Sequence, residues 1–256
     1  MYTDEQFEEL EQKERFLTEE VIIAMLLVLS VTQSELEKEL RSFYQMYGKD
    51  GVVTYQEARK WVSEKDHRKR LNVLLLLISG AFSSALFSIT PKFESLLGDV
   101  ISKEYDFFNI DLDGKDIDFI LAAPWGADDV TWLTRLSDDV DLWGVNVAND
   151  IKRSLLRRDT IDDVLSQLNK RFMTLANILI KLVMTESTAV GYLARRSIFK
   201  ELGVSKYRYY AREDERTCEV CGSLHGLEFP VSSYEIGVNA SPMHPWCRCW
   251  EVPIME

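Results

Sequence analysis

The chain has 256 residues, of which 46% are hydrophobic and 28% charged, a composition that is typical of globular proteins and excludes wholesale disorder. Its 42 acidic and 30 basic residues give a formal net charge of −12, which disfavours a general nucleic-acid coat protein. The opening sequence MYTDEQFEELEQKERF is acidic and lacks the basic start of a secretory signal. We therefore expect the reducing cytoplasm, where disulfides are rare.

Residues 1–159 are expected to form a helical N-terminal body. Ser34 can cap one helix, and Thr54 with Glu57 three residues later has the spacing of a capping box. Pro91 can begin a further helix, because the first position of a helix needs no N–H group. The sequence thus predicts several successive helices in this part of the chain.

The apolar run from Leu71 to Ile89 is long enough to span a bilayer. It contains Asn72, Gly80 and four serines, however, and it follows the charged sequence EKDHRKR. These polar residues favour a buried helix. We therefore expect no membrane span.

The strongest helical signal lies in residues 160–203. An uninterrupted heptad seam of apolar residues predicts one long connecting helix over about 160–202. Thr160 and Asp163 have capping-box spacing at its start, and Gly203 can terminate it. Such a seam most often forms the core of a helix bundle within one chain, and an oligomer or partner interface is the alternative. The seam consists of Ile161, Leu165, Leu168, Phe172, Leu175, Leu179 and Leu182.

Glu186 occupies the next position of this seam, where an apolar residue is due. Because burying an unpaired carboxylate costs on the order of several kcal/mol, Glu186 needs a partner. Arg212 and Arg216 are the candidates. We interpret the three residues as a structural latch between the long helix and the tail, and a catalytic role for Glu186 as the less favoured alternative.

Charge is unevenly distributed along the chain. Residues 71–150 carry 14 acidic and 4 basic side chains, whereas residues 151–210 carry 5 acidic and 12 basic ones. A solvated helix face is the simplest interpretation of the basic stretch, and a surface that contacts DNA phosphate or an acidic partner is the alternative. The candidate contact residues are Lys152, Arg153, Arg157 and Arg158.

Residues 204–256 are expected to form a small α+β or β module. The sequence KYRYYAR at 206–212 alternates, so that Tyr207 and Tyr209 would share one face of a strand. The residues that follow are rich in turn formers and short β-like pieces. A module of this size buries little apolar surface unaided, which favours a stabilising cross-link or metal.

All four cysteines lie in this module. Cys218 and Cys221 form CEVCG, a turn in which two thiolates converge on one zinc ion. His244 and Cys247 follow in SPMHPWCRCW, and the 22 residues from 222 to 243 are enough to form a hairpin and return to the same ion. The two halves together supply the four ligands of a closed zinc site.

We predict that the ligands of a structural zinc ion are Cys218, Cys221, His244 and Cys247. Cys249 is the alternative ligand, because it would point to the same side of a strand as Cys247, and His225 is less favoured. Four protein ligands leave no open position for a substrate water, and metal binding would stabilise the module. The predicted fold is mainly α (α+β): an elongated multi-helix body with one long helix, followed by a small zinc-stapled C-terminal module.

Three other interpretations fit the cysteines less well. Two disulfides would leave His244 unexplained and would need an oxidising compartment. A nucleophile pair of Cys247 and His244 would lack any marked oxyanion hole or orienting Asn. A zinc deaminase requires H-x-E and P-C-x-x-C, whereas here Pro245 is followed by Trp246 and a C-x-C.

With these residues in view, the C-terminal third resembles the phage head morphogenesis family, the minor head proteins similar to the F protein of phage Mu. The matching elements are Thr185–Glu186, the strand YRYYA, DERTCEVC, LHGLEF and SPMHPWCRC, in the family's order over residues 185–249. His225 stands where the family usually has Asp, whereas Gly226 of the same turn is kept.

The resemblance implies a non-enzymatic minor capsid protein of the virion that associates with the portal vertex and assists head assembly, genome packaging or delivery. Portal protein is the implied partner, and major capsid protein, scaffolding protein and double-stranded DNA are further candidates. The expected location is the capsid interior or portal vertex, and the host cytoplasm during assembly. The alternatives are a nucleic-acid-binding zinc module and, less favoured, a metal-dependent hydrolase.

Overall fold

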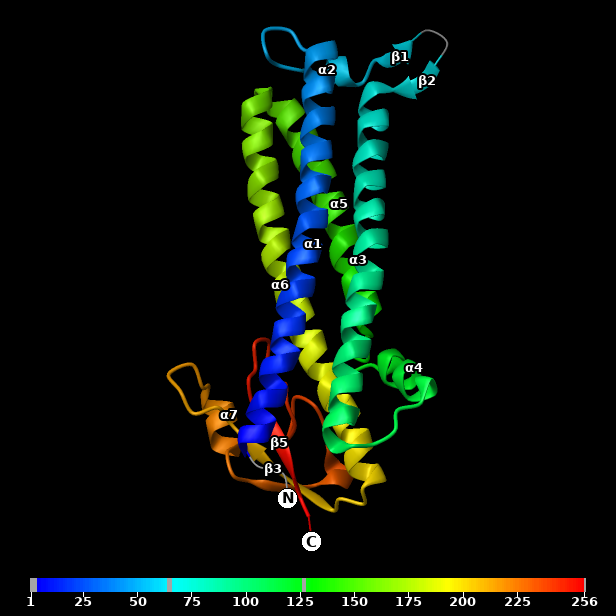
Figure 1. Cartoon of the computed structure of the whole chain (residues 1–256). Coiled ribbons are helices and arrows are strands. Elements are labelled where there is room, and N and C mark those ends of the chain that lie inside the picture. Colours follow the sequence, from blue (N-terminus) through cyan, green and yellow to red (C-terminus); the bar gives the residue numbers. More distant parts are fainter. Residues whose placement is uncertain (1–3, 64–65, 126–127, 256) are drawn as a thin grey trace. The chain divides into compact units, whose positions relative to one another are not determined.

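The computed structural model describes residues 4–63, 66–125 and 128–255, and the predicted mainly α (α+β) fold is confirmed. Long helices make up most of the described chain, and short strands follow the last long helix (Figure 1). In chain order the elements are α1 (Asp4–Tyr47), α2 (Tyr55–Ala58), β1 (Trp61–Ser63), β2 (Asp66–Lys69), α3 (Arg70–Phe108), α4 (Gly114–Ala122), α5 (Trp132–Arg157), α6 (Ile161–Glu201), β3 (Lys206–Tyr210), α7 (Glu219–Leu224), β4 (Glu228–Pro230), the 3₁₀ turn η1 (Val231–Ser233) and β5 (Trp250–Ile254).

Contacts divide the chain into two compact units. The first unit comprises Met1–Ile22, Lys92–Arg135 and Ile180–Glu256, and the second comprises Ile23–Pro91 and Leu136–Leu179. The long helices α1, α3, α5 and α6 each contribute residues to both units. The compact units therefore do not follow the predicted boundaries at residues 159 and 203, because each is assembled from segments that are distant in sequence.

The second unit packs segments of the four long helices against one another. Phe82 of α3 stacks on Phe172 of α6 with ring centroids 5.8 Å apart. Gly144 of α5 lies against Phe82, since a Cβ atom there would sit 3.5 Å from the ring. Tyr44 of α1 donates its hydroxyl to the carbonyl of Asp159, at 3.3 Å.

Helix α6 agrees with the prediction of one long helix. Thr160 Oγ1 accepts the backbone N–H of Asp163 at 3.3 Å, and the Asp163 carboxylate accepts the N–H of Thr160 at 3.1 Å, which completes a capping box. Gly203 ends the helix at φ +66°, a left-handed conformation that glycine adopts without strain. From Leu165 onward the predicted seam is buried within the chain, so its residues serve as bundle core.

Two predicted helix starts are wrong. Helix α1 continues through Ser34, and α3 continues through Pro91. Pro91 is exposed, and Phe87, whose carbonyl loses its helix donor to the proline, is 84% exposed. Because the break in the hydrogen-bond ladder faces solvent, water can bond this carbonyl and the helix continues. The capping contact at Thr54 is present, with its Oγ1 3.1 Å from the N–H of Glu57, but the helix that it begins has only four residues.

Three helices of the described chain, α1, α3 and α6, are long and apolar enough to cross a membrane by length and composition alone. In α3 the predicted buried run has one buried face, with Leu74, Ile78 and Phe82, whereas Leu76 and Phe87 on the other side are exposed. The expectation of no membrane span stays a prediction.

The first unit joins helices to the small sheet through aromatic contacts. The sheet has the order β4-β3-β5 with both pairs antiparallel, and Tyr207 of the central strand lies opposite Phe229 and Pro253. Phe108 of α3 packs edge-on against Phe199 of α6 at 5.8 Å, and Phe199 in turn lies 6.4 Å from Tyr207. The sheet is therefore part of the helical core of this unit, and it carries the cysteine-rich segments.

Candidate metal centre

Strand β3 supplies one wall of the cysteine cluster. Tyr207, Tyr209 and Ala211 point to the buried side, as the alternation of the sequence predicted. Tyr209 and Ala211 pack with Cys221, Cys247 and Cys249 in one buried cluster. The Tyr209 hydroxyl lies 3.5 Å from Cys221 Sγ. Strand β3 thus places the hydroxyl donor of Tyr209 beside the sulfur of Cys221, among mostly apolar side chains.

Helix α7 brings Cys218 and Cys221 together. Cys218 is the N-cap of this short helix, and its Sγ accepts the backbone N–H of Cys221 at 3.4 Å. An N–H group aimed at a sulfur stabilises a thiolate, which is the ligand form of cysteine. The CEVCG sequence therefore folds into the turn that was predicted for it.

The second half of the cluster approaches Cys221 at distances that fit tetrahedral zinc. Cys221 Sγ lies 3.8 Å from Cys247 Sγ and 3.5 Å from His244 Nε2. With Zn–S near 2.3 Å and Zn–N near 2.0–2.1 Å, tetrahedral angles place two sulfurs about 3.8 Å apart and sulfur and nitrogen about 3.6 Å apart. These two distances therefore fit a zinc ion shared by Cys221 with Cys247 and with His244.

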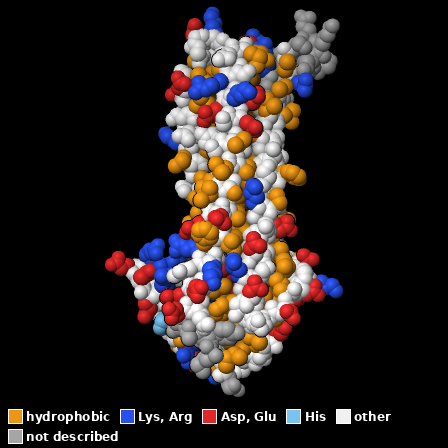
Figure 2. Space-filling view, viewed as in Figure 1, with side chains coloured by type: hydrophobic (Ala, Val, Ile, Leu, Met, Phe, Trp, Pro, Cys, Tyr) orange, Lys and Arg blue, Asp and Glu red, His pale blue; other side chains and the backbone are white. Residues whose placement is uncertain are grey.

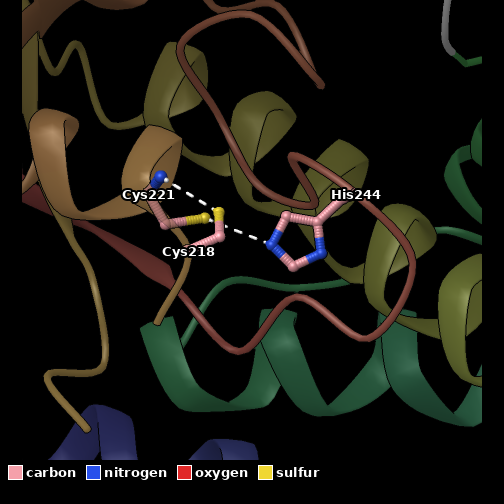
Figure 3. A group of neighbouring side chains, drawn as sticks. All are labelled: Cys218, Cys221 and His244. Carbon is pink, nitrogen blue, oxygen red and sulfur yellow. Dashed lines mark hydrogen bonds between the residues drawn. The ribbon is translucent and has the colours of Figure 1, made fainter. Parts of the chain in front are cut away.

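His244 is oriented toward the two thiols of α7 (Figure 3). Its Nδ1 atom lies 2.8 Å from the carbonyl oxygen of Pro245, so the proton assigned to Nδ1 is donated there. This contact leaves the Nε2 lone pair directed at Cys221. A carbonyl that fixes the tautomer of a histidine in this way is the usual outer partner of a metal ligand.

The described residues form two overlapping groups of metal-ligand atoms, each with all its atoms within 4.8 Å of one another. One contains Cys218, Cys221 and His244, and the other contains Cys221, Cys247 and Cys249. Cys221 belongs to both. The predicted ligands are thus divided between two groups that share Cys221, neither group contains all four, and the choice between Cys247 and Cys249 stays open.

The thiols have opposite pKa shifts. Hydrogen bonding from Cys249 lowers the pKa of Cys247 to about 4 despite its burial, and the N–H of Cys221 lowers the pKa of Cys218. Burial raises the pKa of Cys221 to about 12, and the hydrogen bond to Cys247 with burial raises that of Cys249. Neighbouring thiolates repel one another at these distances, and a divalent cation would allow several of them to ionise together.

One comparison with known proteins gives a family match for the part of the chain that holds this cluster. A family model described as Phage Mu protein F like protein matches residues 145–252. These residues are similar to the Phage Mu F-like family. The matched segment includes the end of α5, all of α6, the sheet strands β3 and β4 and the whole cysteine cluster. No curated protein and no solved structure matches the chain. The match supports a phage head morphogenesis protein.

The latch predicted for Glu186 has different partners, and both lie outside the matched residues 145–252. Glu186 is 1% exposed, and its carboxylate accepts hydrogen bonds from Arg135 at 2.9 Å and from Trp125 Nε1 at 2.6 Å. Burial raises the pKa of Glu186 while these two donors oppose the shift. The predicted pairing with Arg212 and Arg216 is therefore wrong: Glu186 joins α6 to α5 through Arg135, and to the segment before α5 through Trp125, instead of to the tail.

An ion pair that the sequence reasoning missed connects the two halves of the cysteine cluster. Arg248 donates to both carboxylate oxygens of Asp214, each at 2.6 Å, and this pair lowers the pKa of Asp214 well below its usual range. Asp214 opens the DERTCEVC element and Arg248 lies between the two cysteines of CRC. Both residues stand close to the cysteines in the sequence, and this closeness is the sequence signal that could have identified the pair.

A buried polar network attaches the Mu F-like tail to the helices. Arg195 is fully buried and pairs with Glu104 of α3 through two hydrogen bonds, one of 3.0 Å from Nε. The Tyr192 hydroxyl lies 2.8 Å from Glu11 and also contacts the carbonyl of Cys249. Adjacent turns of helix α6 thus form hydrogen bonds with α1, with α3 and with the cysteine-rich tail.

The remaining predicted site residues lie apart from the cluster. His225 directs Nδ1 at the carbonyl of Ala211 at 3.3 Å and belongs to neither group of metal-ligand atoms. Lys152 is half-buried, whereas Arg153, Arg157 and Arg158 are exposed. Arg153 pairs with Asp150 at 3.3 Å, and Arg157 pairs with Asp159 at 2.6 Å.

Proposed function

We propose that this chain is a non-enzymatic minor head protein that associates with the portal vertex and assists head assembly, genome packaging or genome delivery. The observation that carries the proposal is the Phage Mu F-like match over residues 145–252, which includes the entire cysteine cluster. Portal protein is the proposed partner, and major capsid or scaffolding protein are further ones. The proposed location is the virion, with the host cytoplasm during assembly.

Within this proposal the metal is structural zinc. Cys218, Cys221, His244 and Cys247 would hold it, and zinc would supply a cross-link between α7 and the segment before β5. Four protein ligands would leave no coordination position for a reacting water. The cluster is largely buried beneath β3, which supports a folding role over a catalytic one.

DNA contact is the less supported part of the prediction. Two of the four candidate residues, Arg153 and Arg157, already pair with carboxylates of their own chain. A guanidinium that is paired in this way gains less from a phosphate, since the carboxylate must be released first. The portal-associated role is therefore proposed ahead of a nucleic-acid-binding one.

The test is co-purification from cells that produce the complete phage head. An affinity-tagged chain is expected to retain the portal protein at physiological salt, and purified heads are expected to contain the chain in few copies. The matched control is a chain with Cys221→Ser, in which the metal centre cannot form. Absence of portal protein from the wild-type eluate, with the chain also absent from purified heads, would contradict the proposal.

A further inference from the structure

The solvent-facing side of α3 is uncharged between residues 71 and 91. This segment contains no Asp, Glu, Lys, Arg or His. Its other side is packed into the second unit, where Phe82 stacks on Phe172 of α6. Figure 2 shows hydrophobic side chains exposed along the long helices, with few charged side chains between them. We call six solvent-facing residues, spaced four or three positions apart, the exposed α3 face: Asn72, Leu76, Gly80, Ser83, Phe87 and Pro91.

Large apolar side chains stand toward both ends of the exposed α3 face. Phe87 is 84% exposed and Leu76 is 65% exposed. Leu77, beside Leu76, is 44% exposed. Single exposed apolar residues are common, whereas several on one uncharged helix face mark an interaction site. The exposed α3 face therefore has the composition of a surface that a partner covers.

Small residues occupy the centre of the exposed α3 face. A Cβ atom at Gly80 would meet nothing within 4 Å, so packing within the described residues does not require a glycine there. Glycine in a helix interior is destabilising relative to alanine. Ser79, Ser83 and Ser84 are also exposed. Because small side chains allow two helix backbones to approach closely, a contact with a second helix would explain this glycine.

The exposed α3 face is complementary to itself. Its spacings of four, four, three, four and four positions read the same in both directions. When two copies lie antiparallel, with a two-fold axis at the level between residues 81 and 82, Leu76 is opposite Phe87 of the second copy. Gly80 is opposite Ser83 of the second copy. The helices then approach most closely at the small residues, and the large side chains cover the contact at both ends.

The outermost pair in this arrangement is Asn72 with Pro91 of the second copy. Pro91 has no N–H group, so the carbonyl of Phe87 lacks its helical donor. Asn72 is exposed, and its carboxamide has no hydrogen-bond partner within the described part of the chain. In the antiparallel pair this carboxamide is placed to donate to the Phe87 carbonyl of the second copy, which otherwise bonds water.

A second copy of the chain fits the exposed α3 face better than a bilayer does. Helix α3 is long and apolar enough to cross a membrane. The centre of its exposed face, however, is Gly80 with neighbouring serines, whose hydroxyl groups find no partner in lipid. A facing helix covers such small residues closely and offers hydroxyl and carbonyl oxygens to their hydrogen bonds.

We propose that the exposed α3 face is the contact between two copies of this chain, arranged antiparallel about a two-fold axis. One helix from each copy buries less than the roughly 800 Å² per partner of a standard interface, so the dimer is weak and forms where copies are concentrated. This inference concerns the second unit and goes beyond the proposed role in the phage head. Dimerisation can therefore fail while portal association holds, and the reverse.

The test is sedimentation equilibrium of the full chain from about 5 to 500 µM, a range that includes weak interfaces. The mass of the wild type is expected to rise toward that of a dimer, and Phe87→Asp is expected to weaken association at least tenfold. The matched control is Phe119→Asp on α4, because Phe119 is 74% exposed but lies outside this face. A wild type that stays monomeric, or equal association in Phe87→Asp, would overturn the proposal.

Gly80→Leu separates the contact from folding. Because a Cβ atom at Gly80 meets nothing, this variant is expected to raise the midpoint of thermal unfolding while it weakens association at least tenfold. Unchanged association in Gly80→Leu would overturn the close approach at this residue. A monomeric chain that binds phosphatidylcholine vesicles through Phe87 would overturn the proposal in favour of a bilayer.

Cross-linking with a short bismaleimide tests the antiparallel orientation. Ser83→Cys is next to the proposed axis and is expected to give a covalent dimer. Asn72→Cys is expected to give none, since the two copies of this residue would be about 28 Å apart along the helices at 1.5 Å per residue. The wild type, with its four native cysteines, controls for cross-links through the tail. Cross-linking of Asn72→Cys, or none of Ser83→Cys, would overturn the antiparallel arrangement.

Discussion

Cys221 Sγ lies 3.8 Å from Cys247 Sγ, although 26 positions separate the two residues in sequence. The contact brings α7 next to the segment that precedes β5, and β4 and η1 lie between them in the chain. Cys221 also approaches His244 Nε2 and accepts the Tyr209 hydroxyl. It is therefore the residue through which both halves of the proposed metal centre meet.

Replacing Cys221 with serine is expected to abolish zinc binding and to unfold the tail. Cys221 belongs to both groups of metal-ligand atoms, so neither group keeps three ligands without it. Elemental analysis is expected to fall from one zinc per chain to none, and the midpoint of thermal unfolding to drop. Val220→Ala on the exposed side of α7 is the matched control and is expected to keep its zinc. Full zinc content in Cys221→Ser would show that the ion lies elsewhere.

Cys247 and Cys249 are distinguished by single substitutions. The 3.8 Å contact with Cys221 fits shared coordination by Cys247, whereas the main-chain carbonyl of Cys249 is bound by Tyr192. We expect Cys247→Ser to weaken zinc binding at least 100-fold in competition with a chromophoric chelator, and Cys249→Ser to weaken it less than tenfold. The opposite order would assign the fourth place to Cys249.

Removal of Arg135 is expected to destabilise the chain strongly. The variant Arg135→Met keeps an apolar side chain but leaves the 1%-exposed Glu186 carboxylate without its cation, at a cost of about 3–5 kcal/mol. Urea denaturation gives this free energy of unfolding. Adding Glu186→Gln to Arg135→Met is expected to recover part of the loss, since the buried charge is then absent.

Arg212→Met is the matched control, because Arg212 is one of the two partners that the sequence predicted for Glu186. It is expected to change the free energy of unfolding by less than about 0.5 kcal/mol, because Arg212 is exposed and Glu186 is bonded elsewhere. A loss as large as that of Arg135→Met would restore the pairing that the sequence suggested.

Asp159 is expected to make the chain sensitive to acid. The hydrogen bond from Arg157 lowers the pKa of Asp159 to about 2 from a usual value of 3.8. A group with a depressed native pKa stabilises the fold above pH 3.8, and this stabilisation is lost as the pH falls toward 2. At pH 7 the variant Asp159→Asn is expected to be about 1 kcal/mol less stable, since solvent screens the exposed Arg157.

The measurement is the difference in unfolding free energy between wild type and Asp159→Asn from pH 7 to pH 2. Because acid would also release a bound metal from both proteins, only this difference reports on Asp159. It is expected to shrink below pH 4. A difference that stays constant over this range would contradict the assignment, and Asp118→Asn on α4 serves as a control.

Local signals in the sequence predicted the elements that depend on local chemistry. The heptad seam, the Thr160–Asp163 box and Gly203 define α6, and the alternation of Tyr207 and Tyr209 defines β3. Ser34 failed as a boundary because packing along α1 overrides a weak local preference for a break, and Pro91 failed because the break that it makes in the hydrogen-bond ladder of α3 faces solvent. The spacing of the cysteines likewise predicted that they form a cluster, but it did not decide whether Cys247 or Cys249 is the fourth ligand.

Ion-pair partners that lie far apart in the sequence could not be predicted from local sequence patterns. Glu186 needed a cation, and the sequence near the tail offered Arg212 and Arg216, whereas the fold brings Arg135 from 51 positions away. The pairing of Arg195 with Glu104 spans 91 positions. No spacing in the sequence predicts either pair, since each pair depends on which two helices lie next to one another.

The most direct test of the metal centre is X-ray absorption at the zinc edge on the full chain purified without added metal. We predict one zinc per chain with three sulfur neighbours near 2.3 Å and one nitrogen neighbour near 2.0–2.1 Å. Absence of zinc, or a zinc ion with a water oxygen in place of a sulfur, would contradict a closed structural site.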